Sequence, residues 1–468
     1  MDVDSNLKVI IVGAGIGGLT CAIACRREGF EVVVLERANR IVPMGAGIQV
    51  PPNGTKVARQ LGFLDKLLQV ATTVDAVELR RYEDGKKLCE LTEAQCRTTY
   101  GDPWMVVHRA DFHNVLWRTC QELGVSLNLN MEVEKIDFEN DTVYMEDGDE
   151  LFGDVIIGAD GPQSVCRAQF LENPSPLIET GDVAYRAVLP IGRLKALNDP
   201  QINNLCAQNK VMMWLGPNQH TVFYPVRGGR EINLILIRQD YQEPEHSQMG
   251  GDVREMRGCY AGWDETLRKI MSSVPQVQKW KIRTPPMVDL KSRTALRQRK
   301  LTDIKDCFVL LGDAFHSNLP YQAQGAAMAM EDGAFLAKIL GLAKERLQGK
   351  DVQERENKLD HSEVHLRDKY MEETELKKLV PTMLEEYGAI RGKRASDALC
   401  GENCTEPLRK WFHMPDGLKQ EARDAELAGI DIEDKSSYTA WHWHCDSVLG
   451  YDAVREANEV FTTGLRTR

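Results

Sequence analysis

The sequence predicts an α/β protein in which a parallel sheet is assembled from two separate parts of the chain. Three observations support this fold class. A glycine-rich turn links an apolar run to a helical pattern near the N-terminus, and two later apolar runs end in Gly-Ala-Asp-Gly and Gly-Asp. Between these two runs the pattern changes to alternating strands, which predicts an inserted antiparallel sheet. After the Gly-Asp segment, mixed charges at helical spacing predict a helical C-terminal region.

The composition is that of a globular protein large enough for two or three domains, with 468 residues, 43% hydrophobic and 27% charged. No apolar run reaches the roughly 18 residues that a membrane helix needs. The opening "MDVDSN" lacks the features of a secretory signal, so we expect a cytoplasmic protein. A net charge of −12, without a basic stripe, argues against a nucleic-acid partner.

Twelve scattered cysteines predict mostly reduced thiols and no disulfide framework. Two short segments, Cys400–Cys404 ("CGENC") and His442–Cys445 ("HWHC"), contain residue types that bind zinc. Neither segment has a second pair of ligands at zinc-like spacing. We therefore predict no metal site.

The first element is a βαβ unit, "LKVIIVGAGIGGLTCAIACRREGFEVVVLER". Its β-branched run, residues 9–12, leads into G-x-G-x-x-G at Gly13, Gly15 and Gly18, and a second apolar run stops at Glu36. In a Rossmann-like unit the first glycine permits the tight turn, the second lets the backbone approach a pyrophosphate, and the third lets helix and sheet pack closely. A carboxylate at the end of the second strand accepts hydrogen bonds from ribose hydroxyls and repels a 2′-phosphate. The unit therefore predicts bound FAD or NAD, and not NADP.

The elements that follow differ from the successive βα units expected of an NAD enzyme. "GAGIQVPPN" predicts a second glycine-rich loop that includes Gly47, followed by a helix with Asn53 as its N-cap. A further helix begins near Arg109. The strand in "DVIIGADGPQSVCR" ends near Asp160, and the strand in "FVLLGDAFHSNLPYQAQG" ends near Asp313.

This combination resembles the aromatic-hydroxylase family of FAD-dependent monooxygenases, which includes p-hydroxybenzoate hydroxylase and salicylate hydroxylase. The motifs "GAGIGG", "GADGPQSVCR" and "LLGDAFHSNLPYQAQGAAMAMED" occur in the family's order between Val9 and Asp332. "GAGIQVPPN" and "HMPDGLKQEARD" are similar to segments of the salicylate-hydroxylase-like branch, much of it fungal. The chain departs from that branch at Phe315 and Ser317, where Cys and Pro are common. It has Ala323 where p-hydroxybenzoate hydroxylases have glycine.

The resemblance implies a three-layer, Rossmann-like FAD-binding domain of the glutathione-reductase type, with the antiparallel sheet as a roof over the substrate. The expected domains are residues 1–180 for the first part of the FAD-binding domain, 181–290 for the substrate domain, 291–345 for the second part of the FAD-binding domain, and 346–468 for the C-terminal helical region. FAD would then lie between segments that are far apart in the chain.

The resemblance also implies contacts to the cofactor. Asp313 would accept a hydrogen bond from a ribityl hydroxyl, and Arg109 would reach the ribityl-phosphate region. The backbone of Gln324, Gly325 and Ala326 would direct N–H groups at the pyrimidine end of the flavin. The other expected cofactor-binding residues are Gly13, Gly15, Gly18, Glu36, Gly47, Gln49 and Asp160. Asp160 together with Arg167 would support either the cofactor or the nicotinamide donor.

The implied activity is hydroxylation of a phenolic aromatic substrate with O₂ and NAD(P)H, through a flavin C4a-hydroperoxide. Because the chain has no second G-x-G-x-x-G, NADPH or NADH is expected to bind only transiently, as a co-substrate. The alternatives are an oxidase or epoxidase of the same fold that acts on an isoprenoid or alkaloid, and a non-catalytic flavin-binding protein. Decarboxylating and dearomatising hydroxylation both stay open, as do a monomer and a homodimer.

The candidate catalytic residues, Arg186 and Tyr224, lie in the predicted substrate sheet. A guanidinium in an apolar strand needs a partner, because an unpaired buried charge is costly. Arg186 would favour an ionised phenol and lower its pKa, and Tyr224 is the second candidate for this role. The alternatives are an arginine that faces the surface or pairs with Asp182, and a tyrosine that only packs. For His316, close behind Asp313, a structural role is the simpler interpretation.

Overall fold

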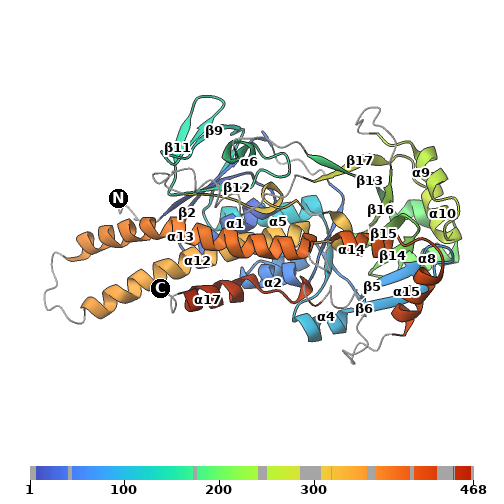
Figure 1. Ribbon diagram of the computed structural model, residues 1–468. Helices are drawn as coiled ribbons and strands as arrows, with labels where there is room; N and C mark the ends of the chain where they lie inside the picture. The colour runs from blue at the N-terminus through green and yellow to red at the C-terminus, as the bar shows by residue number, and fades with distance from the viewer. Residues whose placement is uncertain are drawn as a thin grey trace.

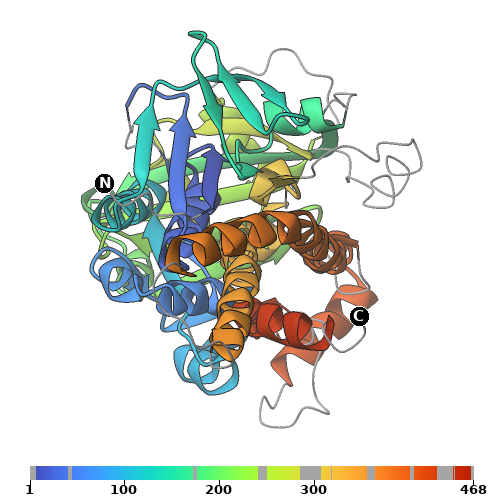
Figure 2. The same cartoon turned by 90° about the vertical axis from the view of Figure 1, so that its left-hand side faces the viewer.

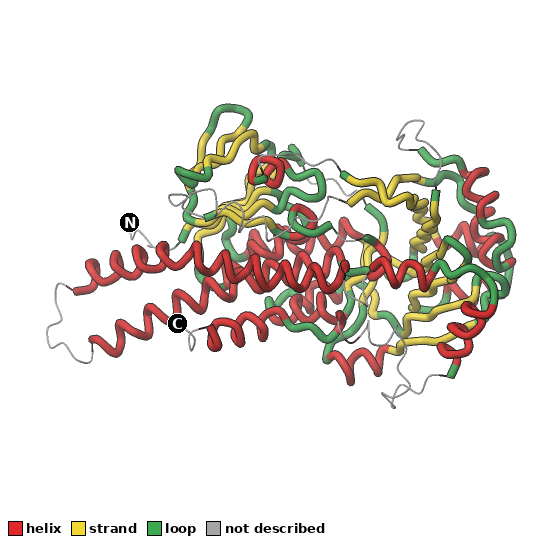
Figure 3. Tube along the Cα trace, viewed as in Figure 1, coloured by secondary structure: helices red, strands yellow, loops and turns green. Residues whose placement is uncertain are grey.

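In a computed structural model of the protein, the described residues are 7–40, 45–171, 177–240, 250–284, 307–317, 319–355, 364–400, 405–429, 446 and 448–464. Within these ranges the strands form four sheets (Figure 1). Two long helices, α12 (Gly325–Arg355) and α13 (Val364–Cys400), pack side by side and extend past the sheets at one end of the molecule. Figure 3 shows the strands gathered in separate regions, with these helices along one side.

A five-stranded parallel sheet forms the centre of the first region, as the sequence predicted. Its strand order is β18-β12-β1-β2-β8. The strands are β1 (Lys8–Val12), β2 (Glu31–Glu36), β8 (Ser126–Leu129), β12 (Val155–Gly158) and β18 (Phe308–Leu310). Strand β18 joins the sheet from far along the chain by pairing with β12, with Ile157 opposite Val309. The β-branched residues of β1 are buried on both faces, which is typical of a strand inside a parallel sheet.

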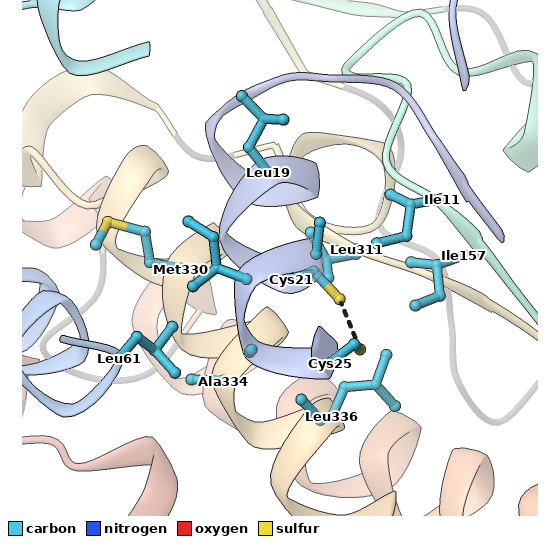
Figure 4. Close-up of a cluster of buried hydrophobic side chains, with 14 of the residues drawn as sticks. Ile11, Leu19, Cys21, Cys25, Leu61, Ile157, Leu311, Met330, Ala334 and Leu336 are labelled. Carbon is cyan, nitrogen blue, oxygen red and sulfur yellow. Dashed lines mark hydrogen bonds between the residues drawn. The ribbon is translucent and has the colours of Figure 1, made fainter. Parts of the chain in front are cut away.

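Helices cover one face of this sheet. They are α1 (Ile16–Arg27), α5 (Arg109–Glu122) and α12. Figure 4 shows Cys21 and Cys25 of α1 in the same buried cluster as Ile11 of the sheet and Ala334 and Leu336 of α12. Glycine at position 333 allows the two helices to approach closely, because a Cβ there would lie only 2.7 Å from the Cα of Cys21.

A three-stranded antiparallel sheet covers the other face. It consists of β9 (Val133–Asp137), β10 (Thr142–Met145) and β11 (Glu150–Phe152). Its residues Ile136 and Val143 pack against Ile10 and Val12, whereas the alternate residues of β1 face the helices. The helix–sheet–sheet arrangement is the three-layer fold that the resemblance implied.

The second strand-rich region is a seven-stranded sheet with the order β17-β13-β16-β15-β14-β5-β6. Its strands are β5 (Ala76–Arg81), β6 (Lys87–Thr92), β13 (Ile178–Pro190), β14 (Lys210–Gly216), β15 (Gln219–Val226), β16 (Glu231–Gln239) and β17 (Gln278–Thr284). All neighbours are antiparallel except β14 and β5, which are parallel. The helices on its outer side are α7 (Ile191–Lys195), α8 (Pro200–Cys206), α9 (Val253–Cys259) and α10 (Glu265–Ser272) (Figure 1).

Two strands of this sheet, β5 and β6, come from residues 1–180, which the sequence assigned to the FAD-binding domain. The expected division of the chain therefore does not describe this sheet fully. The expected boundary near residue 290 lies outside the described residues and stays a prediction.

A small sheet and three helices lie between the two regions. The sheet has the order β3-β7-β4, with β3 (Gly47–Val50), β4 (Thr72–Thr73) and β7 (Met105–His108). The helices are α2 (Pro52–Gln60), α3 (Leu64–Leu68) and α4 (Glu93–Tyr100). Helix α6 (Val165–Phe170) instead packs against β9 in the first region. The expectation that Asn53 caps α2 was wrong: Pro51 is the N-cap, and Asn53 lies in the first turn with its side chain fully buried.

The C-terminal region is helical, as predicted. Besides α13 it contains α14 (Thr405–Phe412), α15 (Leu418–Ala428) and α17 (Ala453–Gly464). Figure 2 views the molecule from the end at which α12 and α13 extend past the sheets and shows α17 beside α12. Helix α13 continues through Pro381.

Candidate functional site

Four residues expected to bind the cofactor meet at the carboxyl edge of the parallel sheet. Gly13 follows β1, Glu36 ends β2, Asp160 follows β12 and Asp313 follows β18. Because these four strands are parallel neighbours, the turns after them lie along one edge. In open α/β sheets this edge is where ligands bind.

The three glycines of the first turn have different surroundings. Gly13 has a φ of +106°, and a Cβ there would lie 2.5 Å from the carbonyl oxygen of Ala159. A Cβ on Gly18 would lie 2.1 Å from the carbonyl oxygen of Gly13. At Gly15 no atom lies within 4 Å of such a Cβ. Packing therefore requires glycine at the first and third positions, while the space beside Gly15 is open to a ligand.

Two cavities follow this edge, one of about 410 Å³ and one of about 230 Å³. Four residues line both of them: Gly15, Arg109, Ala159 and Gly161. The smaller cavity reaches Glu36, and the larger extends past Asp313 to Arg186 in the seven-stranded sheet. Together they form an elongated space that runs from the end of β2 to the wall of the seven-stranded sheet.

The Glu36 carboxylate lies at one end of this space. Its Oε2 accepts a hydrogen bond from the backbone N–H of Ala14 at 2.9 Å, and its Oε1 accepts one from the N–H of Ala38 at 2.9 Å. These bonds orient the carboxylate at the tip of β2. Each oxygen can still accept a further hydrogen bond, such as one from a ribose hydroxyl.

Asp160 lines the smaller cavity, and its carboxylate also accepts a hydrogen bond from the N–H of Cys166 at 3.1 Å. The buried guanidinium of Arg167 donates to the carbonyl oxygens of Ala314 at 3.0 Å and Pro162 at 2.6 Å. Arg167 therefore joins the turn after β12 to the turn after β18. It does not line either cavity, so it supports these turns from behind.

Arg109 lies at the start of α5, where the two cavities meet. Its backbone N–H donates to the carbonyl oxygen of Ala46 at 3.0 Å, which ties it to the second glycine loop. Its side chain is exposed, and no described residue accepts a hydrogen bond from its guanidinium. This cation is available to an anionic ligand in the elongated space.

Gly47 and Gln49 line the larger cavity from β3. A Cβ on Gly47 would lie 2.6 Å from the ring of Tyr224, and its N–H donates to Asn233 Oδ1 at 2.9 Å. Gln49 Oε1 accepts a hydrogen bond from Trp104 Nε1 at 3.1 Å. Glycine at position 47 thus allows the connecting sheet to approach the seven-stranded sheet.

Asp313 lies in the turn η1 (Gly312–Ala314), deep in the molecule but with its side chain exposed to the larger cavity. No described residue donates a hydrogen bond to its carboxylate. Burial raises the pKa of Asp313, and the neighbouring His316 and Arg109 only partly oppose this rise. His316 is buried, and its Nε2 donates to Asp332 at 2.7 Å, as expected of a structural histidine.

Gln324, Gly325 and Ala326 line the same cavity at the start of α12. The first N–H groups of a helix have no partner within the helix, so they can donate to a ligand. Just before them, Ala323 adopts a left-handed conformation with a φ of 56°.

These surroundings fit FAD. Starting from the Glu36 end, the elongated space offers a carboxylate, an open backbone position beside Gly15, the guanidinium of Arg109, the carboxylate of Asp313 and the N–H groups at the start of α12. Neither Arg109 nor Asp313 makes a side-chain hydrogen bond to another described residue. The order of these groups matches adenosine ribose, pyrophosphate, ribityl chain and flavin ring.

Arg186 and Tyr224 lie on the opposite wall, in β13 and β15. The guanidinium of Arg186 lies 5.3 Å from the centre of the Trp280 ring, and its Nε is buried without a hydrogen-bond partner among the described residues. Burial lowers the pKa of Arg186. Burial raises the pKa of Tyr224, and the charge of Arg186 opposes this rise.

The alternative partner for Arg186, Asp182, is engaged elsewhere. Its Oδ1 accepts a hydrogen bond from Arg409 at 3.2 Å, and its Oδ2 accepts one from Tyr321. Apolar residues surround the exposed part of Arg186 in the cavity: Val222, Ile235 and Ile237. This wall of the cavity therefore presents the guanidinium of Arg186 and the side chain of Tyr224 among apolar side chains.

Sequence reasoning missed a group of buried polar residues behind the cavity, namely Asn53, Glu331, Asp332 and Arg391. The signal was an adjacent Glu-Asp pair inside the otherwise apolar stretch "GAAMAMEDGAFLA". Such a pair in an apolar helix needs buried cations.

No helix within the described ranges is long and apolar enough to cross a membrane. Among the same residues no three side chains gather as metal ligands, and the segment 442–445 lies outside them.

Comparisons with known proteins point to one family. Residues 6–355 match the family model described as FAD binding domain. The chain is 32% identical over 467 residues to FAD-dependent monooxygenase OpS4 of Beauveria bassiana, covering 97% of this chain and 96% of that protein. It is 32% identical over 341 residues to 3-amino-4-hydroxybenzoate 2-monooxygenase of Streptomyces cremeus, covering 72% and 79%. A solved salicylate hydroxylase substrate complex has the same fold, with a TM-score of 0.70 at 21% identity over 97% of this chain and 98% of that one.

Proposed function

Because the chain belongs to the aromatic-hydroxylase family of FAD-dependent monooxygenases, we propose that it hydroxylates a phenolic compound bound against Arg186. In the balanced reaction, substrate, O₂, NAD(P)H and a proton give hydroxylated product, water and NAD(P)⁺. When bound, FAD supplies the electron transfer and the oxygen activation. The protein's own side chains bind the phenol, hold it in its ionised form and keep bulk water away.

The observation that carries this proposal is the Arg186 guanidinium in the apolar wall, whose buried Nε has no hydrogen-bond partner among the described residues. An unpaired buried charge is unfavourable, so the cavity favours a ligand that brings a negative charge to Arg186. A phenol bound there would have its pKa lowered by the guanidinium, and an ionised phenol donates electrons to its ring more readily. Tyr224 would add a hydrogen bond to the same oxygen.

The relatives support the same substrate class. One of them is named for 3-amino-4-hydroxybenzoate and another for 3-hydroxybenzoate, and both names describe phenols with a carboxylate. We propose a phenol for this chain, and its ring substituents decide whether hydroxylation also releases CO₂.

Arg186→Met tests the proposal, with Arg193→Met as the control, because Arg193 is an exposed arginine of α7 that does not line the cavity. The assay follows NAD(P)H consumption and oxygenated product with a panel of phenols. Losing a charged hydrogen bond of about 1.5–3 kcal/mol should slow substrate-stimulated turnover roughly 10- to 100-fold, while the flavin spectrum is retained. Raising the pH, which ionises the phenol without help from Arg186, should recover part of the rate. A variant that hydroxylates phenols at the wild-type rate would remove Arg186 from the substrate site.

A further inference from the structure

Two adjacent carboxylates, Glu331 and Asp332, lie in α12 directly behind the larger cavity, and both are fully buried. Neighbouring residues of a helix point in directions about 100° apart, so the two side chains reach different segments. Neither of them lines the cavity.

Asp332 holds the turn that carries Asp313. Its Oδ2 accepts hydrogen bonds from the N–H of Gly312 at 2.9 Å and from His316 Nε2 at 2.7 Å. Burial alone would raise the pKa of Asp332, but His316 and Arg391 outweigh it and lower this pKa to about 2. The turn that presents Asp313 to the cavity is therefore held on both sides, at Gly312 and at His316, by one carboxylate.

Glu331 holds the other segment. Its Oε1 accepts a hydrogen bond from Asn53 Nδ2 at 2.6 Å, and the same amide nitrogen donates to Gln324 Oε1 at 2.8 Å. Gln324 lines the cavity immediately before the free N–H groups of α12. Glu331 thus fixes this segment through the side chain of Asn53.

Arg391, in α13, joins the two carboxylates. Its Nε donates to Asp332 Oδ1 at 2.7 Å, and its Nη2 donates to Glu331 Oε2 at 2.8 Å. The guanidinium is fully buried, and its Nη1 donates to Tyr451 Oη at 2.7 Å. Arg391 lies beyond residues 6–355, the part of the chain that matches the FAD-binding family model.

We propose that Arg391 is a positioning residue for the flavin ring, because one guanidinium from the C-terminal helix holds both carboxylates that fix the cofactor-facing turns. Loosening either carboxylate would shift Asp313 or the N–H groups at the start of α12. These N–H groups stabilise negative charge on the reduced flavin, so a shift would make the flavin harder to reduce. The inference rests on the FAD site and not on the choice of substrate, so its test needs no substrate.

The test compares Arg391→Lys with Arg423→Lys. Arg423 is also buried and lies in the C-terminal helix α15, where its guanidinium donates to Asp424 Oδ1 at 2.7 Å, and neither Arg423 nor Asp424 lines the cavity. Lysine keeps the positive charge in both variants, but its single nitrogen cannot reproduce the fork that joins two carboxylates. The measurements are the FAD dissociation constant from flavin fluorescence, the visible spectrum, the midpoint potential and the melting temperature of the apoprotein.

We expect Arg391→Lys to weaken FAD binding at least fivefold and to make the midpoint potential more negative, while Arg423→Lys stays within twofold of wild type. A purely structural arginine would lower the melting temperature without moving the potential, and this result would overturn the proposal. Equal losses in both variants would overturn it too. If Arg391→Lys does not fold, the same measurements are made on Asp332→Asn, which is a near-isosteric change at the other end of the same ion pair. Wild-type FAD affinity and wild-type midpoint potential in that variant would refute the inference. Wild-type protein that takes up no FAD would instead count against the FAD site itself.

Discussion

Replacing Gly13 and Gly15 one at a time by alanine should separate folding from FAD binding, although the two residues are close neighbours in one turn. Gly13→Ala should destabilise the protein before any cofactor is added. Gly15→Ala should leave the apoprotein almost intact and weaken FAD binding.

The magnitudes follow from the local geometry. At Gly13 the φ of +106° is unfavourable for alanine, at a cost of about 1–2 kcal/mol. The added Cβ would lie 2.5 Å from the carbonyl oxygen of Ala159, and relieving that overlap costs about 1–3 kcal/mol more. Gly13→Ala should therefore lower the free energy of unfolding of the apoprotein by about 2–5 kcal/mol.

At Gly15 the backbone is extended, with φ −71° and ψ −179°, and nothing lies within 4 Å of an added Cβ. Alanine there loses only the mild N-cap preference of glycine, which is worth about 0.5–1 kcal/mol. Its methyl group projects into the space expected for the pyrophosphate. We expect FAD binding at least tenfold weaker, which corresponds to about 1.4 kcal/mol.

Urea unfolding of the apoprotein and titration with FAD, followed by flavin fluorescence, measure the two effects separately. Gly192→Ala is a control for the change from glycine to alanine, because Gly192 also has open space around it and, in α7, lines neither cavity. The reasoning fails if Gly15→Ala binds FAD as tightly as wild type, or if both turn variants destabilise the apoprotein equally.

Three further predictions concern the same site and its surroundings. Ala323→Gly should raise the melting temperature or leave it unchanged, because the left-handed backbone conformation at this position costs an alanine about 1–2 kcal/mol and costs glycine nothing. A clear drop in the melting temperature would contradict this. Asp313→Asn should weaken FAD binding roughly tenfold, because a neutral amide is a weaker hydrogen-bond acceptor than a carboxylate. The same change should not destabilise the apoprotein, because the raised pKa of Asp313 means that folding disfavours its charged form. Unchanged affinity for FAD would exclude Asp313 from the site. His220 and His413 are both buried, and His220 Nδ1 lies 2.8 Å from His413 Nε2. Burial lowers the pKa of His413 to about 3 and lowers that of His220 well below its usual value. Below pH of about 6.5 the unfolded chain therefore binds more protons, and stability should fall by up to ~1.4 kcal/mol per pH unit for each imidazole. Urea unfolding between pH 7.5 and about pH 5 measures this slope, which should be shallower in His413→Gln, and equal slopes would refute the assignment.

The sequence alone determined the parallel sheet and the turns at its carboxyl edge. Gly13 and Gly18 report backbone conformation and close packing within one βαβ unit, so local pattern was sufficient to predict them. The apolar runs that end near Asp160 and Asp313 predicted buried strands with polar turns behind them, and parallel pairing then brought these turns together.

Only the tertiary structure decided how buried polar groups are partnered. Nothing in the local pattern shows that Asp182 binds Arg409 and leaves Arg186 facing the cavity, or that β5 and β6 extend the seven-stranded sheet. Asn53, predicted as a helix cap, instead links Glu331 to Gln324. The physical reason is that a strand or turn is specified by neighbours in sequence, whereas the partner of a buried charge is whichever group the packing of distant segments brings within hydrogen-bonding distance.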